Sequence, residues 1–238
     1  MGGKFIIFVK NLEMVVKNQK CFIMKKFFYL LALCLSVLVF SSCSKDDDEG
    51  GISKTPVSVA VDLGLSVKWA TCNVGANSPE ECGDFFAWGE TEPKETYNWN
   101  TYSDPYYTKY STSGKSTLDL SDDAAHVNWG GNWRMPTKTE WDELHTGCTW
   151  TWTTDYEGTG VYGYIVKSKT NNNSIFLPAA GLRRGSDLYF AGSNGNYWSS
   201  SLYPSLSNYA YVLDFGSGYM NLNNYYRYDG QSVRPVSD

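Results

Sequence analysis

The composition of residues 186–230 constrains this chain more than any other feature. The segment holds nine Tyr, eight Ser, six Asn and five Gly, but no Lys, no Glu and a single Arg, Arg227. Solvated surfaces are normally rich in Lys and Glu, so this is not an ordinary surface. Tyr supplies rigid amphipathic contact area, and Ser, Gly and Asn supply adaptable hydrogen bonds, as in antibody loops. Two interpretations stay open: a segment built for contact, or a Gly/Ser/Asn-rich loop region threaded by aromatic core strands.

The N-terminal part predicts targeting rather than folding. Lys25 and Lys26 precede an apolar run over residues 27–40, and small residues then lead to Cys43. A basic region, a short apolar core and a small-residue cleavage site form a secretory signal. A cysteine directly after the small residues resembles a bacterial lipoprotein signal, in which Cys43 becomes the lipidated first residue. A plain secretory signal is the alternative.

We therefore expect three parts. Residues 1–42 are an upstream extension and the signal peptide, with residues 1–23 preceding a second candidate start at Met24. Residues 43–55 are an acidic flexible tether, and residues 56–238 are one ligand-binding domain, long enough for a sizeable core. The acidic run after Cys43 also resembles the surface-export signal of Bacteroidetes lipoproteins. That resemblance implies an outer-membrane location on the cell surface, with membrane contact through the lipid.

Charge and cysteine usage exclude some partners. Residues 43–238 carry 14 basic and 24 acidic side chains, a formal net charge of about −10, so we expect no nucleic acid. Cys72, Cys82 and Cys148 remain after the signal, which allows at most one intrachain disulfide, and Cys72–Cys148 is the preferred pair. His145 lies three positions before Cys148, but no CxxC spacing accompanies them, so we expect no metal and no cofactor.

The first half of the domain predicts few regular elements. A strand pair is expected around residues 60–62 and 67–70. Residues 91–114 lack periodicity and contain many Thr, Tyr, Ser, Asn and Pro, which predicts a long ordered loop. Ser121 is expected to cap a short helical turn over residues 122–125.

One helix is predicted clearly by the residues at its N-terminus. Thr137 and Glu140 form a capping box, which predicts a helix from that point. Trp141 and Leu144 lie three apart and are expected to be buried on one face, and Gly147 is expected to end the helix in a left-handed cap.

In the second half of the domain, the side-chain pattern repeats every two residues, as in β-strands. Residues 149–156 and 161–168 flank a Gly-containing turn and predict a hairpin. Residues 174–177 predict a short buried strand, residues 209–215 alternate, and residues 231–236 predict a closing strand. Few helices and many short strands predict an α+β domain with antiparallel sheets, one clear helix and long loops.

No catalytic pattern stands out. GTGVYG at residues 158–163 matches a phosphate-binding motif by letter, but a strand follows it where that mechanism needs a helix N-terminus, so we expect a hairpin turn. The only histidines are His126 and His145. No nucleophile elbow occurs, and His126 has the setting of a hydrogen-bonded structural residue.

Five blocks resemble a known family. They are WATCNVGA at residues 69–76, FAWGET at 86–91, NWGGNWRMPTKTEWDEL at 128–144, YWSSS at 197–201 and SVRPV at 232–236. Together they resemble the Fibrobacter succinogenes major paralogous domain family of gut Bacteroidetes surface lipoproteins. The resemblance covers the chain from about residue 60 to its end and implies a C-type-lectin-like fold, shared with formylglycine-generating enzymes.

The same resemblance sets expectations for chemistry. Those enzymes use cysteines late in the chain, and none follows Cys148 here, which excludes the catalytic branch. The calcium signatures of C-type lectins are missing, and Lys94 stands where an ion-coordinating residue would follow Glu92 and Pro93. The tail also resembles the variable proteins of diversity-generating retroelements, in which adenine-directed mutagenesis rewrites codons into those for Asn, Tyr, Ser, Asp and Gly.

We therefore expect a non-catalytic module that binds a protein or glycan on a face formed by the tail. Tyr197 and Tyr211 are expected in the core, and Trp133, Trp141, Trp198 and Arg234 in the frame. The expected ligand-binding residues are Tyr189, Asn194, Asn196, Tyr203, Asn208, Tyr209, Tyr219, Asn221, Asn223, Asn224, Tyr225, Tyr226 and Tyr228. A structural or fimbria-associated surface subunit is one alternative, and a divergent member of the formylglycine-generating-enzyme-like fold with catalysis is another.

Overall fold

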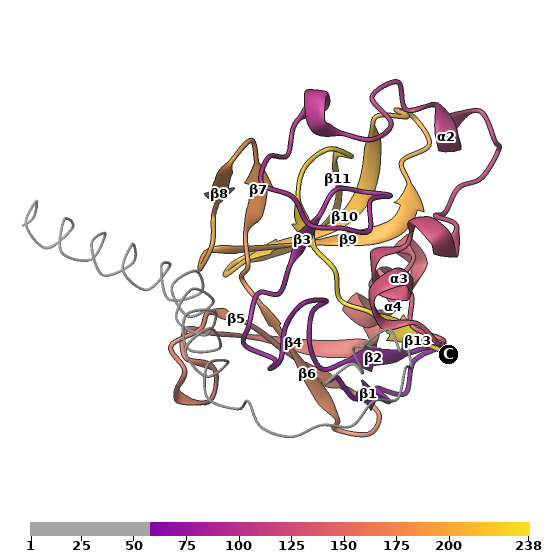
Figure 1. The fold of residues 1–238 in the computed structure, drawn as a ribbon. Coiled ribbons are helices and arrows are strands. Elements are labelled where there is room, and N and C mark those ends of the chain that lie inside the picture. Colours follow the sequence, from indigo (N-terminus) through magenta and orange to yellow (C-terminus); the bar gives the residue numbers. More distant parts are fainter. Residues whose placement is uncertain (1–57) are drawn as a thin grey trace, which may run out of the picture. The chain divides into compact units, whose positions relative to one another are not determined.

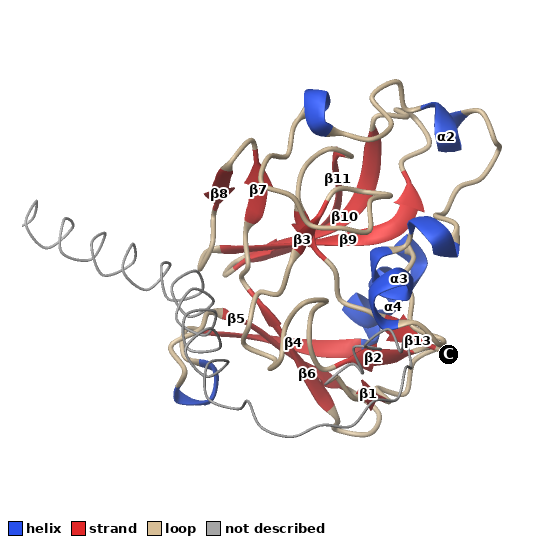
Figure 2. Ribbon diagram, in the orientation of Figure 1, coloured by secondary structure: helices blue, strands red, loops and turns tan. Residues whose placement is uncertain are grey.

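The computed structural model describes residues 58–238, which lie within one compact unit spanning residues 56–238. The expected signal peptide, the lipidation site Cys43 and the tether lie outside the described residues. The described part is a mixed α+β structure with several antiparallel sheets (Figure 2). Among its helices only α4, Lys138–Gly147, exceeds two turns.

A five-stranded sheet forms the centre, in the order β11-β10-β9-β12-β3. Its strands are β3 (Phe85–Phe86), β9 (Asn194–Leu202), β10 (Tyr209–Gly216), β11 (Tyr219–Tyr226) and β12 (Gln231–Ser232). Neighbours pair antiparallel except β12 and β9, which pair in parallel. Three of these strands come from the Tyr/Asn/Ser-rich tail, so the tail is sheet rather than loop.

Smaller sheets surround this one. The three-stranded sheet β4-β5-β6 consists of Cys148–Thr153, Gly163–Ser168 and Ser174–Pro178. A second three-stranded sheet joins β1 (Ala60–Val61), β2 (Lys68–Ala70) and β13 (Val236–Ser237), and β7 (Leu182–Arg184) pairs with β8 (Asp187–Tyr189). The expected pair near residues 60 and 69, the hairpin and the buried strand near residue 175 are confirmed.

The largest hydrophobic cluster lies between two sheets. Figure 1 shows β4-β5-β6 on one side of the five-stranded sheet and the segment that carries α2 (Thr108–Ser111) on the other. Side chains from both sheets and from α4 fill the first space, among them Val166, Leu177 and Phe215. A second cluster on the opposite side of the sheet contains Trp88, Trp198 and Val212.

The start of α4 follows its sequence signal, whereas its end does not. Thr137 and Glu140 form the capping box, and Trp141 and Leu144 are fully buried. Gly147 is the last helical residue and does not adopt a positive φ, so the expected left-handed cap is wrong. A Cβ at Gly147 would lie 2.5 Å from Cδ2 of Leu65, which is the flexible end of that side chain.

Three further expectations need correction. Helix α3 (Ala124–Trp129) begins after Asp123, whose carboxylate accepts hydrogen bonds from the N–H groups of Ala125 and His126, so Ser121 is not the cap. The expected strand over residues 231–236 divides into β12 and β13, which belong to different sheets. The loop over residues 91–114 contains a 3-10 turn, Trp99–Thr101, and helix α2.

The preferred disulfide is also wrong. Cys72 and Cys148 are both buried free thiols. Cys148 belongs to the core between the two sheets, where burial raises the pKa of its thiol to about 11. Cys72 instead donates from its thiol to the hydroxyl of Thr71, at 3.6 Å, at the end of β2.

Candidate ligand-binding face

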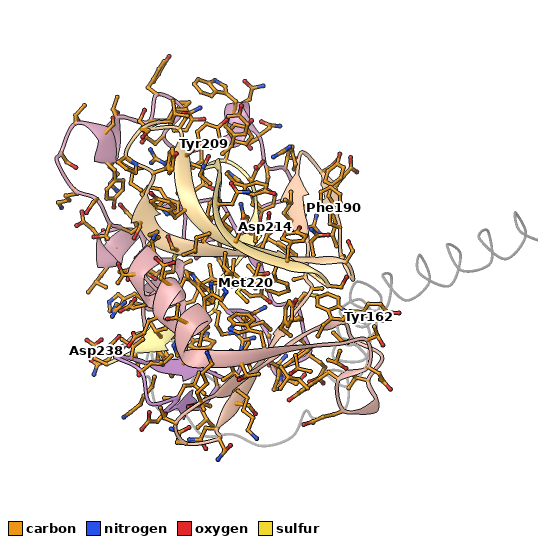
Figure 3. The ribbon with its side chains drawn as sticks, turned by 180° about the vertical axis from the view of Figure 1, so that it is seen from behind. Tyr162, Phe190, Tyr209, Asp214, Met220 and Asp238 are labelled. Carbon is orange, nitrogen blue, oxygen red and sulfur yellow. The ribbon has the colours of Figure 1, made fainter. Side chains whose placement is uncertain are left out.

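Strand register divides the tail between two faces of the five-stranded sheet. Asp214 on β10 pairs with Asn196 on β9 and Asn221 on β11, so these three side chains share a face. Phe215 and Leu213 point the other way and pack toward β4-β5-β6. We call the side that carries Asn194, Asn196, Trp198, Val212, Asp214, Tyr219, Asn221, Asn223 and Tyr225 the Asp214 face. Figure 3 labels Asp214 on its strand, with Tyr209 at the start of that strand.

Asp214 is the centre of a hydrogen-bond cluster on this face. Its Oδ1 accepts from Asn196 Nδ2 at 3.2 Å and from the Tyr219 hydroxyl at 3.3 Å. Its Oδ2 accepts from the Tyr225 hydroxyl at 3.4 Å. Asn194 donates in turn to the hydroxyl of Tyr219. The cluster therefore links β9, β10 and β11 through side chains as well as backbone.

Burial controls the electrostatics of this cluster. Asp214 is 7% exposed, and desolvation raises the pKa of its carboxyl above the ordinary value, although hydrogen bonds from neutral donors partly oppose the rise. Burial, followed by the negative charge of Asp214, raises the pKa of Tyr225 to about 12. The phenol of Tyr225 therefore remains protonated at neutral pH and donates to the carboxylate.

The polar row continues toward β12. Ser232 pairs in parallel with Tyr197, so Gln231 and Asn196 lie side by side on the Asp214 face. Gln231 is completely buried, and neither its Oε1 nor its Nε2 has a hydrogen-bond partner. Asn196 Oδ1 is likewise buried and unpartnered. Buried polar atoms are almost always paired in folded proteins, so three unpaired atoms in one row are unusual.

An ion pair borders the same face. Arg184 on β7 binds the carboxylate of Asp229 with two hydrogen bonds, of 2.9 and 2.7 Å. Asp229 is fully buried, and desolvation raises its pKa while Arg184 opposes the rise. The positive charge of Arg184 is therefore already matched by a carboxylate.

Further tyrosines form a strip at the other end of the sheet. The rings of Tyr209 and Tyr226 lie 4.5 Å apart, and those of Tyr226 and Tyr228 lie 4.9 Å apart, almost parallel. Tyr203 packs edge-on against Tyr211 at 5.1 Å. By register, Tyr209 and Tyr226 point away from the Asp214 face, so the expected residues do not form a single surface.

The structure sorts the expected ligand-binding residues into groups. The Asp214 face holds Asn194, Asn196, Tyr219, Asn221, Asn223 and Tyr225. The strip holds Tyr203, Tyr209, Tyr226 and Tyr228. The remaining three stand apart, with exposed Tyr189 on β8, Asn208 before β10, and Asn224 on the opposite side of β11.

Two placements differ from expectation. Asn196 is 1% exposed, because strands flank it on both sides, so it does not present itself to solvent. Tyr211 is half-buried rather than in the core, since its ring packs on Tyr203 near the end of the sheet. Tyr197 is fully buried as expected. Trp141, Trp198 and Arg234 are fully buried frame residues, and Trp133 is half-buried.

Sequence reasoning missed Asp214 and Gln231. The alternation of residues 209–215 places Asp214 on the same side as Ala210 and Val212, and a carboxylate on an apolar side of a strand is an available signal. Gln231 carried no such signal, because its burial depends on β12 lying between β9 and β3.

A buried arginine supports the far edge of the face. The guanidinium of Arg227 lies 4.7 Å from the ring centroid of Trp88 and 5.3 Å from that of Tyr107. Its Nη2 forms an ion pair with Asp104 at 3.2 Å. Arg227 thereby fastens the segment over residues 102–110 to the end of β11.

Three further features of residues 58–238 concern metal ligands, His126 and helix hydropathy. No group of three or more His, Cys, Asp or Glu in this part is placed to hold a metal ion. The ring of His126 hydrogen-bonds the carbonyl of Trp133 at 3.2 Å, as a structural histidine does. No helix of the described part is long and apolar enough to cross a membrane.

One family model matches the chain. Residues 162–236, which include β9, β10 and β11, match a domain of unknown function (DUF8237). No match was found among curated proteins or among solved structures. The matched region contains all the residues of the Asp214 face.

Proposed function

We propose that residues 56–238 form a non-catalytic ligand-binding module with a C-type-lectin-like fold, anchored through lipidated Cys43 to the outer membrane and displayed on the cell surface. Its ligand is a protein or a glycan. One observation carries the proposal: six of the residues expected from composition converge on one face of the central sheet, around Asp214.

The surroundings support this role. The opposite face of the sheet packs on a hydrophobic core, and fully buried Trp198 and Val212 continue the Asp214 face into a second core. Contact residues on such a frame lose little freedom on binding, because packing already fixes the backbone. Tyr219, Asn221 and Asn223 are exposed on the edge strand, where substitution costs little stability.

The experiment uses the soluble unit, residues 56–238, against peptide and glycan arrays. The test variant carries Asn221→Ala and Asn223→Ala, and the matched control carries Thr149→Ala and Thr151→Ala, which are also exposed and lie on β4. We expect saturable capture of at least one ligand, lost in the test variant and kept in the control. Equal capture by both variants would show that the ligand binds elsewhere.

A specific observation also favours a structural subunit. Strand β11 is the edge of the five-stranded sheet, and its eight residues carry no charged side chain. Edge strands are normally protected from pairing with other chains by charge, Pro or bulges. Stoichiometric self-association of the soluble unit, abolished by Asn223→Lys, would favour assembly through this edge. A monomer in sedimentation experiments would favour ligand binding instead.

Diversification of the tail is the third part of the proposal. Exposed Asn and Tyr positions on a rigid sheet tolerate replacement, which suits a face rewritten by a diversity-generating retroelement. A reverse-transcriptase gene beside this gene, with a near-copy of the tail codons that differs only at adenines, would support it. A locus with neither element would indicate fixed specificity.

A further inference from the structure

The Asp214 cluster combines a buried carboxylate with a buried amide oxygen that has no hydrogen-bond partner. Asp214 brings two carboxylate oxygens, and Asn196 adds an Oδ1 that no group in the described part of the chain satisfies. These two residues are 7% and 1% exposed, so neither is freely hydrated. A carboxylate can accept about four hydrogen bonds, and Asp214 receives them from the neutral side chains of Asn196, Tyr219, Asn223 and Tyr225, so its negative charge is hydrogen-bonded but not neutralised.

No cation of the described part neutralises this carboxylate. Its donors are the amides and phenols of the cluster, and Arg184, the cation bordering the face, already binds Asp229. Residues 186–230 contain no Lys. A buried carboxylate without a cation is costly, and that cost is relieved when a ligand brings one.

The route by which a ligand would reach Asp214 lies at the edge of the sheet, beside Tyr219. Tyr219 begins β11 directly after the Ser217 and Gly218 turn, and its side chain is 41% exposed. Its hydroxyl covers Oδ1 of Asp214. Displacement of this exposed ring is the movement by which a ligand would reach the carboxylate.

We propose that the Asp214 cluster receives a cationic side chain, lysine or arginine, from a polypeptide ligand. The N–H groups of the cation donate to Asp214, where they replace the Tyr219 hydroxyl, and to Asn196 Oδ1. An ammonium or guanidinium brings a positive charge and donors alone, which matches an unneutralised carboxylate and the unpartnered Asn196 Oδ1, whereas a sugar hydroxyl brings an acceptor with each donor. The inference rests on the proposed function and assigns its ligand to the polypeptide class.

The first test titrates side-chain analogues into the soluble unit. The probes are Nα-acetyl-lysine methylamide and Nα-acetyl-arginine methylamide, with the norleucine and citrulline analogues as neutral counterparts. The readouts are the carbon-13 shift of the Asp214 carboxylate and the nitrogen-15 shift of the Asn196 side-chain amide. We expect saturable shifts with a cationic probe and none with its neutral counterpart. Equal responses, or no response to either cation, would overturn the inference.

A matched pair of variants tests whether the response to the cationic probes depends on Asp214. Asp214→Asn removes the charge and keeps the shape, and Asp187→Asn removes an exposed charge on β8 nearby. We expect at least a roughly tenfold weaker response in Asp214→Asn and an unchanged response in Asp187→Asn. Well-dispersed spectra of both variants verify that they fold.

The peptide arrays separate this inference from the proposed function. Each captured peptide is compared with versions in which its Lys or Arg is replaced by Gln. We expect such replacements to abolish capture by the wild type. Capture of a glycan or a Gln-replaced peptide that depends on Asn221 and Asn223 but not on Asp214 would overturn the inference and leave the proposed function standing.

Discussion

The hydroxyl of Tyr225 lies 3.4 Å from Oδ2 of Asp214, and the ring of Tyr225 packs against the cluster that contains Trp198. One side chain therefore joins the polar part of the Asp214 face to its apolar part. We therefore expect substitution of Tyr225 to change both binding and stability, and substitution of exposed Asn221 to change binding alone.

Two substitutions at Tyr225 test this coupling. Tyr225→Phe removes one hydrogen bond and keeps the ring, so we expect a loss of about 1 kcal/mol in the free energy of unfolding. Tyr225→Ala also removes the packing, so we expect a loss of about 3 kcal/mol. Urea unfolding monitored by Trp fluorescence measures both. Equal losses would show that the ring contributes nothing to the frame.

The raised pKa of Asp214 predicts a pH dependence. A carboxyl with a higher pKa in the folded than in the unfolded state binds its proton more tightly when folded, so its contribution to stability is present at low pH. That contribution is lost as pH rises from the ordinary value of 3.8 through the folded-state pKa. We expect the stability difference between Asp214→Asn and the wild type to shift in favour of the variant over this window. A difference that is constant with pH would contradict the raised pKa.

Gly195 and Gly147 are expected to differ in how well they tolerate replacement by alanine. A Cβ at Gly195 would lie 2.1 Å from the ring of Phe215, which is fully buried, so we expect Gly195→Ala to cost about 1–3 kcal/mol. A Cβ at Gly147 meets only the flexible end of Leu65, and alanine favours the helix, so we expect Gly147→Ala to change stability by less than about 1 kcal/mol. Thermal unfolding of both variants provides the comparison, and a costlier change at Gly147 would contradict this packing.

Replacement of Arg227 by lysine is expected to lower the free energy of unfolding even though the positive charge is kept. Arg227→Lys keeps the charge but replaces a planar group that contacts several rings, so we expect a loss of about 2 kcal/mol. Arg183→Lys, on a half-buried residue over the ring of Phe85 at 5.6 Å, is the control and should cost less than about 1 kcal/mol. Chemical denaturation measures both, and similar losses would argue against a special role for Arg227.

Local signals in the sequence predicted local structure well. The capping box at Thr137 and the hairpin over residues 149–168 depend on neighbours in the chain, and both are confirmed. Gly147 lies against Leu65, which is distant in the sequence, and the break between β12 and β13 depends on which distant strands they join. Such long-range contacts leave no pattern in a single sequence.

In the candidate site, too, local signals were predictable from the sequence and long-range contacts were not. The composition of residues 186–230 indicated that the tail carries the contact residues. The alternation of side chains assigns each residue to one side of its strand. Composition could not show that Asn196 is buried or that Gln231 lies beside it, because both facts depend on the parallel pairing of β12 with β9.

The most direct test of the binding face is the natural variation of the tail, sequenced in a population of cells and in paralogous copies of the gene. The account predicts more variation at Tyr219, Asn221 and Asn223 than at Thr149, Thr151 and Lys167, which are also exposed. Asp214 and Trp198 should stay constant. Equal variation in the two exposed sets, or variation concentrated on the Tyr209 and Tyr226 side, would contradict it.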